Sequence, residues 1–141
     1  MRRQWLRAGL VVLAATSVLV GLWALLAPQS FYDDFPGGGR AWVSAQPPYN
    51  EHLVRDVGAL NLALAVLLGW AAVTLERRVV QVALIAALVY AVPHFTFHVA
   101  HLEHLSTGDN VAQTAALALG VLLPLALLVV AGRARGEADD R

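Results

Sequence analysis

Four long apolar runs constrain this chain more than any other feature of its sequence. They cover residues 8–27, 51–75, 79–105 and 110–131, and charged residues are few in each. A helix needs about 20 mostly apolar residues to cross the hydrocarbon core of a membrane. Backbone groups in lipid must bond within their own segment, so runs of this length are expected to be helical. We therefore predict an all-α fold, an integral membrane four-helix bundle that forms one domain over residues 1–141.

The composition agrees with a membrane protein and excludes several other classes. Apolar residues make up 58% of the chain and charged residues 14%, against roughly 45–50% and about 25% in soluble proteins. A soluble globular domain, a disordered protein and a nucleic-acid binder are thereby excluded, and a formal net charge of 0 offers no broad field to a charged partner. The chain has no cysteine, which excludes disulfides and thiolate metal sites. The lipid bilayer is the first expected partner, and oligomers remain possible.

The basic residues, all ten of them arginine, predict the orientation of the bundle. If the four runs alternate in direction, only Arg40 and Arg55 fall on one side. The positive-inside rule then places both termini in the cytoplasm, which we expect for a multi-pass protein of a bacterial inner membrane. We expect the first run to be retained and not cleaved as a signal, because Pro28 directly follows the plausible cleavage residue Ala27. The opposite side holds the other eight arginines, namely Arg2, Arg3, Arg7, Arg77, Arg78, Arg133, Arg135 and Arg141.

The external loop expected at residues 28–50 is rich in proline, glycine and aromatic residues. Its prolines and the run Gly37, Gly38 and Gly39 predict an irregular segment that contains no helix. Two compatible roles follow for its rings: an aromatic belt at the membrane interface, or a lid that hinges on the glycines over the mouth of a cavity. These rings belong to Phe31, Tyr32, Phe35, Trp42 and Tyr49.

The five histidines all fall in the half of the bundle that is expected to lie outside. His94, His98 and His101 form one stripe, because a rotation of about 100° per residue keeps them on one helix face. His104 falls on the flank of that stripe. Two histidines spaced i and i+4 can hold one metal ion. Three histidines on one stripe exceed what one such pair requires, so they predict either two ions or one ion together with a proton-handling histidine.

The start of the second long run carries a separate polar face. His52 and Asp56 are spaced i and i+4, as are Glu51 and Arg55, which we expect to form an ion pair. Imidazole and carboxylate ligands suit zinc, iron, manganese or copper without choosing among them. The alternative is that these groups only lie among lipid headgroups, where their cost is small. We predict a metal site whose ligands are His52, His94, His98 and His101, with Glu51, Asp56 and Glu103 as catalytic acids or bases.

Several functions are compatible with this cluster. We favour a metal-dependent membrane enzyme that acts on a lipophilic small-molecule substrate, in which the ion activates water or oxygen. The alternatives are a b-type haem protein with His52 opposite His94 or His98, a non-catalytic accessory or scaffold subunit, and a metal-free isomerase or cyclase that uses the carboxylates.

Residues inside the runs predict helix contacts. Asn61 is expected to hydrogen-bond a neighbouring helix, and Gly58, Gly69 and Gly120 are expected to mark close approaches between helices. Pro93, directly before His94, is expected to kink the third helix and to turn the histidines into the bundle.

The second run opens with Arg55, Asp56, Val57, Gly58 and Ala59 after a long external loop. In this motif, its length and its loop, the chain resembles the small four-span bacterial membrane proteins of the DoxX-like type. That resemblance implies a four-helix bundle and no defined activity. The segment from His94 to His104 is also similar to the His-rich boxes of membrane di-iron desaturases and hydroxylases, although those proteins carry several boxes and this chain carries one.

Overall fold

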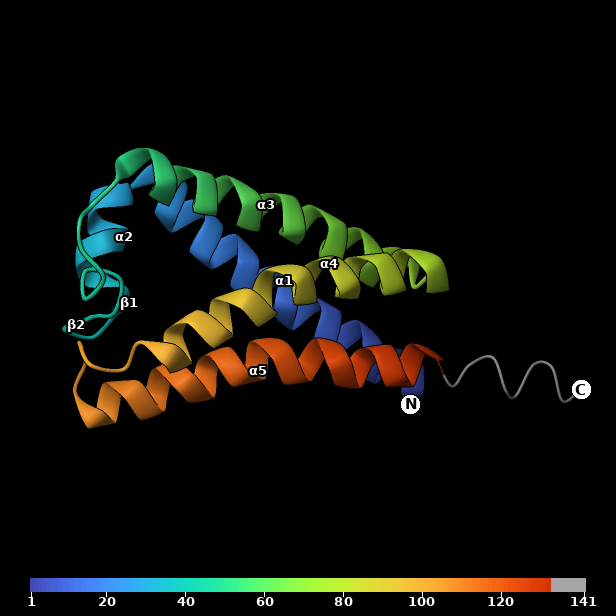
Figure 1. Ribbon diagram of the computed structural model, residues 1–141. Helices are drawn as coiled ribbons and strands as arrows, with labels where there is room; N and C mark the ends of the chain where they lie inside the picture. The colour runs from blue at the N-terminus through green and yellow to red at the C-terminus, as the bar shows by residue number, and fades with distance from the viewer. Residues whose placement is uncertain (133–141) are drawn as a thin grey trace, which may run out of the picture.

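The computed structural model describes residues 1–132 of the 141-residue chain. These residues form five helices and one two-stranded antiparallel sheet (Figure 1). Four of these helices are long and apolar enough to cross a membrane. This confirms the prediction of an all-helical chain with four such helices, while Arg133, Arg135 and Arg141 lie outside the described residues. The elements are α1 (Arg2–Leu26), α2 (Pro28–Asp34), β1 (Pro36–Gly37), β2 (Arg40–Ala41), α3 (Glu51–Thr74), α4 (Arg77–Ala100) and α5 (Thr107–Gly132).

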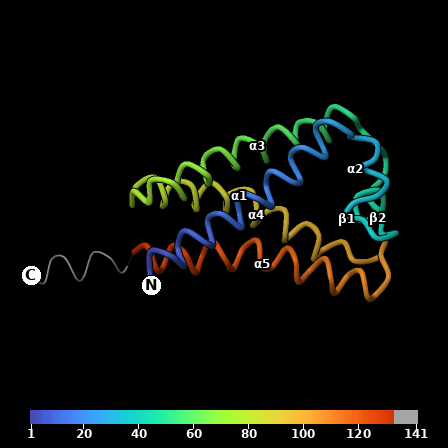
Figure 2. Tube along the Cα trace, turned by 180° about the vertical axis from the view of Figure 1, so that it is seen from behind, coloured from blue at the N-terminus to red at the C-terminus, as the bar shows by residue number. Residues whose placement is uncertain are grey.

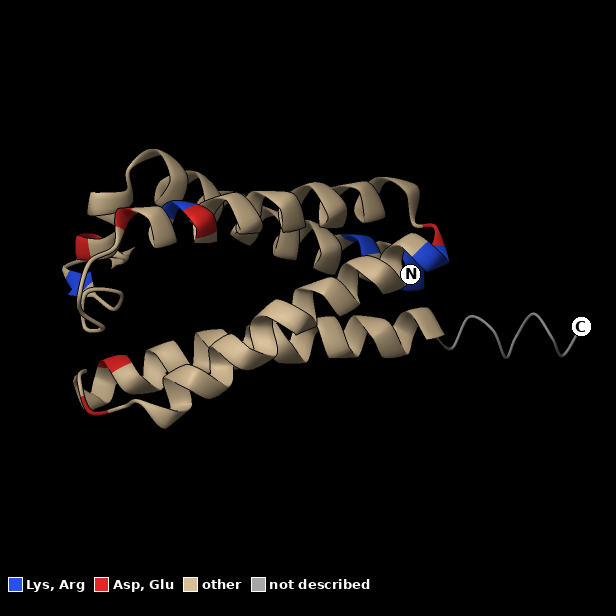
Figure 3. Cartoon of the chain, turned by 45° about the horizontal axis from the view of Figure 1, so that its top comes forward, with Lys and Arg blue, Asp and Glu red and all other residues tan. Residues whose placement is uncertain are grey.

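The bundle has two ends with different contents. The arginine end holds the start of α1, the turn from α3 to α4, and the end of α5, while the hairpin end holds α2, the β1–β2 hairpin and the loop from α4 to α5 (Figures 1 and 2). Charged residues gather toward these two ends (Figure 3). Helix α1 pairs with α3, and α4 pairs with α5; the two pairs meet at the arginine end and diverge toward the hairpin end.

The buried core follows this divergence. The main cluster takes residues from all four long helices, whereas a second cluster at the hairpin end centres on Ala24, Phe31 and Val54 of α1, α2 and α3. Helices α4 and α5 have no share in that second cluster. Apolar burial therefore joins the two pairs mainly toward the arginine end. The main cluster consists of Leu10, Leu68, Ala71, Ala72, Val80, Ala83, Leu84, Leu127 and Ala131.

Two glycines bring the backbones of α1 and α3 into contact. A Cβ added at Gly58 would lie 2.6 Å from the backbone nitrogen of Leu25 and 2.9 Å from the carbonyl oxygen of Gly21. Only glycine fits there, which confirms the close approach predicted at Gly58. The same prediction is wrong for Gly69 and Gly120, because a Cβ at either position would meet nothing within 4 Å.

Two arginine side chains reinforce the α1–α3 pair. Near the arginine end, Arg7 Nε donates to the Ala72 carbonyl oxygen at 3.1 Å. Near the hairpin end, Arg55 Nη1 donates to the Leu25 carbonyl oxygen. Each bond joins a cation on one helix to the backbone of the other, so the pair is held at both ends by polar contacts as well as by packing.

The structure corrects the prediction that residues 28–50 contain no helix. Helix α2 begins at Pro28 itself, because proline has no N–H to leave unpaired at the first helical position and its φ is already helical. The glycine run then turns the chain between β1 and β2, with φ of +97° at Gly37, +67° at Gly38 and +77° at Gly39. Residues that carry a Cβ atom rarely adopt such positive φ angles, so the hairpin requires glycines at these positions.

Helix α4 ends at Ala100 and not at residue 105 as the apolar pattern predicts. His101 leaves the helix with φ −130° and ψ 68°. The following loop is held from α5, where Asn110 Nδ2 donates to the carbonyl oxygens of Leu102 at 2.7 Å and Leu105 at 3.2 Å. Of the predicted three-histidine stripe, only His94 and His98 therefore lie within the helix.

The glycine contact generates a stability prediction. We expect Gly58→Ala to destabilise the bundle by about 1–3 kcal/mol, because the new methyl group meets backbone atoms that cannot move aside. The matched control is Gly69→Ala on the same helix, where the methyl group enters open space. Unfolding of the purified protein in mixed detergent micelles measures both free energies. Equal values for the two variants would show that the close approach does not stabilise the α1–α3 pair.

Candidate polar site between the helix pairs

Five polar side chains from α3, α4 and α5 form a continuous row, which we call the polar row. Its members on α4 are Tyr90, His94 and His98, one turn apart. The Tyr90 and His94 rings stack with centroids 5.4 Å apart, and the His94 and His98 rings meet edge to face at 4.7 Å. Asn61 joins the row from α3, and Gln113 joins it from α5. The row thus bridges the two helix pairs.

The outer members of the row are buried amides. Asn61 is 5% exposed and Gln113 is 4% exposed. Asn61 Nδ2 donates to the Val57 carbonyl oxygen at 2.9 Å and reaches the Tyr90 hydroxyl oxygen at 3.5 Å. Gln113 forms a side-chain hydrogen bond with His98. The contact with Tyr90 confirms the predicted bond from Asn61 to a neighbouring helix.

Sequence reasoning missed Tyr90 and Gln113. The signal for Gln113 was present, since an amide inside an apolar run must find a hydrogen-bond partner when it is buried. Its position within the run does not say which helix supplies that partner. The structure supplies it from α4, through His98.

The two histidines of the row are suited to proton exchange and to ligand binding. A neutral imidazole presents one donor and one acceptor nitrogen. His94 and His98 are each partly buried, and neither takes part in an ion pair among the described residues. Their rings are in contact, so one group bound there could reach both imidazoles.

His101 lies beside the row and does not join it. Its Nδ1 donates to the Phe97 carbonyl oxygen at 2.8 Å, and its ring stacks on the Phe97 ring at 4.2 Å. These two contacts hold the imidazole against the end of α4. His101 therefore packs at the C-terminal end of α4 and does not continue the row from His94 and His98.

The remaining predicted site residues form three local pairs at the hairpin end. Glu51 Oε1 lies 2.9 Å from Arg55 Nε, which confirms that predicted ion pair. His52, whose side chain is 87% exposed, lies 3.2 Å from Asp56, and His104 lies 3.7 Å from Glu103.

The predicted ligand set is therefore not assembled in the structure. Within residues 1–132, no group of three His, Asp or Glu side chains comes close enough to hold a metal ion. His52 and Asp56 belong to the α1–α3 pair and the histidine stripe to the α4–α5 pair, and the two pairs diverge at this end.

The hairpin loop joins the two pairs at the same end. Trp42 is buried, and its indole Nε1 donates to Asp109 Oδ1 at 3.0 Å. Arg40 Nε lies 3.4 Å from the same oxygen, and the Ser106 hydroxyl donates to Asp109 Oδ2 at 2.8 Å. Asp109, in the first turn of α5, thus anchors the hairpin across the gap between the ribbons.

Aromatic packing fixes the other side of the loop. The Phe31 ring lies 4.8 Å from Phe35 and 5.9 Å from Trp23 of α1, and Phe35 lies 6.3 Å from Trp42. Burial, followed by the negative charge of Glu51, raises the pKa of Tyr49 above its ordinary value. The loop is therefore packed on the bundle, and its roles as an aromatic belt or a lid stay predictions.

Comparison with known protein families gives a match to part of the chain. A family model described as "Domain of unknown function (DUF4345)" matches residues 5–95. The matched segment covers most of α1 through α4 and includes Asn61, Tyr90 and His94, while His98 and Gln113 follow it. No curated protein matches, and no solved structure matches.

The anchor at Asp109 generates a prediction about the hairpin. Trp42→Phe keeps an aromatic side chain, although a smaller one, and removes the N–H donor. A hydrogen bond to a charged acceptor contributes about 1.5–3 kcal/mol. We expect faster hydrogen exchange in residues 36–49 and unchanged exchange in the main cluster around Leu68 and Leu84. The control is Trp70→Phe, at a tryptophan that is 60% exposed on α3. If both variants leave exchange in the loop unchanged, the hydrogen bond does not hold the hairpin.

Proposed function

The chain belongs to the DUF4345 family, whose description assigns no activity, and we propose that its polar row binds the polar group of a lipophilic small molecule within the membrane. His94 and His98 contact that group and exchange protons with it. The observation that carries the proposal is the pair of adjoining imidazoles on a membrane-crossing helix, with their rings 4.7 Å apart.

The cost of these residues supports a function. A polar or ionisable side chain inside the hydrocarbon layer is expensive, so such residues generally mark ligand, ion or proton pathways. Here the row takes side chains from three helices. It lies toward the hairpin end, where α4 and α5 contribute no residue to the apolar cluster. A ligand with an apolar body and one polar group suits this site, because the polar group can contact the polar row while the apolar body contacts the surrounding helices.

The other members of the row position the imidazoles. The Tyr90 ring stacks on His94, and Asn61 holds the Tyr90 hydroxyl, so α3 orients the first imidazole. Gln113 bonds the second imidazole from α5. An imidazole fixed in this way can donate a proton to a ligand oxygen and accept it back, as general acid–base chemistry requires.

The proposed setting is the inner membrane of a bacterium, with both termini in the cytoplasm. The arginines support this orientation, since Arg2, Arg3, Arg7, Arg77 and Arg78 all belong to the arginine end of the bundle. The polar row and the hairpin then lie in the outer half, and a ligand would enter from the outer leaflet.

A transition-metal ion on the same imidazoles is the second candidate. The i and i+4 spacing of His94 and His98, with the rings in contact, suits a shared zinc, iron, manganese or copper ion. The protein would supply two ligands and leave the other coordination positions to the substrate and water.

Binding of a lipophilic ligand can be tested with a long-chain methyl ketone, and the alkane of the same length serves as the comparison. In protein labelled with nitrogen-15 at histidine, we expect the ketone but not the alkane to shift the imidazole resonances of His94 and His98. His98→Phe should weaken ketone binding roughly three- to tenfold, the equivalent of one lost hydrogen bond. His52→Phe, at the exposed pair with Asp56, should bind as the wild type does. A ketone affinity in His98→Phe equal to that of the wild type would refute the proposed site.

The metal candidate makes a separate prediction. After extensive washing and reloading with Zn²⁺, His98→Ala should retain less ion than the wild type, while His104→Ala should retain the same amount, because His104 lies outside α4 beside Glu103. Bound ion should also decrease at acidic pH, because protons compete with the metal for the imidazole nitrogens. Elemental analysis measures both. Equal retention in all three proteins would exclude a metal at His94 and His98.

A further inference from the structure

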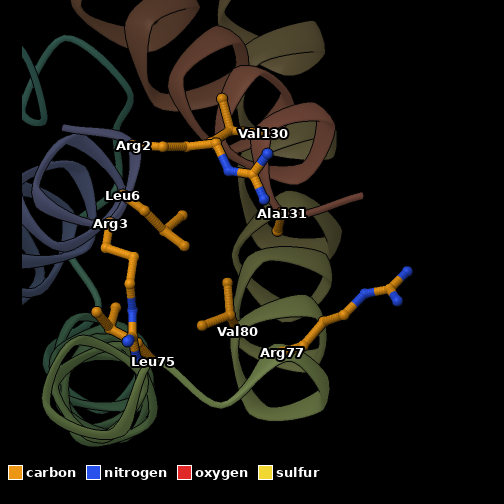
Figure 4. Close-up of a pocket in the computed structure, with 8 residues that line it drawn as sticks. All are labelled: Arg2, Arg3, Leu6, Leu75, Arg77, Val80, Val130 and Ala131. Carbon is orange, nitrogen blue, oxygen red and sulfur yellow. The ribbon is translucent and has the colours of Figure 1, made fainter. Parts of the chain in front are cut away.

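A cavity of about 250 Å³ opens at the arginine end, opposite the polar row. Its lining combines three cations with an apolar wall that includes Leu6, Val80 and Val130 from three different helices. Figure 4 shows Arg2 and Arg3 on either side of the space, Val80 pointing into it, and Arg77 extending from its rim. Positive charge and apolar surface thus meet in one place.

Electrostatics at this cavity favour an anion. Arg3 and Arg77 each bring a positive charge to it, and no acidic residue lines it among the described residues. Helices α1 and α4 both begin here, and neither has a side-chain cap. Their first N–H groups therefore have no side-chain acceptor. The ends of α3 and α5 lie at the same end of the bundle, so the helix dipoles offset one another and the positive charge comes from the arginines.

One of these arginines has an unmet hydrogen-bonding requirement. The Nε of Arg77 is buried and has no hydrogen-bond partner among the described residues. A buried donor without an acceptor costs roughly 1–3 kcal/mol. If the Arg77 side chain turns toward the cavity, an anion with several acceptor oxygens at the rim would supply that acceptor.

We propose that this cavity binds the phosphate group of an anionic membrane phospholipid. The Arg3 and Arg77 side chains contact the phosphate oxygens, and an acyl chain follows the apolar wall beside the partly exposed Leu6 and Val130. The apolar wall favours a lipid over free phosphate, and so does the position, because the ends of membrane-crossing helices lie at the depth of the headgroups. This site is independent of the polar row, which lies toward the opposite end.

The test uses the full chain in detergent micelles with added phosphatidylglycerol, phosphatidylcholine or inorganic phosphate. Native mass spectrometry counts bound lipid, and thermal unfolding reports the stabilisation. Arg3→Gln/Arg77→Gln removes two lining cations. Arg78→Gln is the matched control, since it removes an exposed arginine of the same end that does not line the cavity. Each lining arginine removed should weaken phosphatidylglycerol binding by about fivefold.

The expected result is that phosphatidylglycerol binds and stabilises the wild type and Arg78→Gln more than phosphatidylcholine does, and that the double variant loses this preference. If unfolding without lipid shows the double variant to be misfolded, the single variants Arg3→Gln and Arg77→Gln replace it. Equal losses in Arg78→Gln and the lining variants would overturn the site in favour of unspecific charge attraction. Equal stabilisation by inorganic phosphate would overturn the assignment to a lipid.

Discussion

The backbone contact between α1 and α3 is the interaction on which the other contacts depend. Surrounding lipid is as apolar as the helix faces, so association inside a membrane relies on close packing and polar contacts more than on hydrophobic burial. Gly21 and Gly58 allow the two backbones to touch, and Arg55 bonds the Leu25 carbonyl oxygen one turn away. This fixed pair then carries α2 and the aromatic residues of the loop, and it places Asn61 where Tyr90 of α4 can reach it.

The second helix pair is attached differently at its two ends. At the arginine end α4 and α5 share the main core with α1 and α3, but at the hairpin end their links to the rest are polar: Asn61 with Tyr90, and Trp42 with Asp109. The polar row lies between these two kinds of attachment. The same divergence that separates His52 from His94 leaves the imidazoles of α4 in contact with one another and with α3 and α5 through amides and a phenol.

Features that depend on one helix could be predicted from the sequence, and features that depend on the angle between helices could not. Hydropathy predicts the four long helices, and the i and i+4 spacing predicts the pair of Glu51 with Arg55. The joint ligand set of His52 and His94 required the two pairs to stay together at the hairpin end. The end of α4 was missed because Asn110, from the following helix, holds the loop, and α2 was missed because proline both ends helices and begins them.

The short connection between α3 and α4 has a mechanical consequence. Along the chain, only Leu75 and Glu76 connect the α1–α3 pair to the α4–α5 pair. The two pairs can therefore be treated as two arms that meet at this connection. An arm of 24 residues is about 36 Å long, and a rotation of about 5° at this connection displaces its tip by roughly 3 Å. That displacement is comparable to the 3.0 Å bond between Trp42 and Asp109 at the tips. The hydrogen bond between Trp42 and Asp109 therefore requires the angle between the helix pairs, which is set at the opposite end of the molecule, to stay within a few degrees.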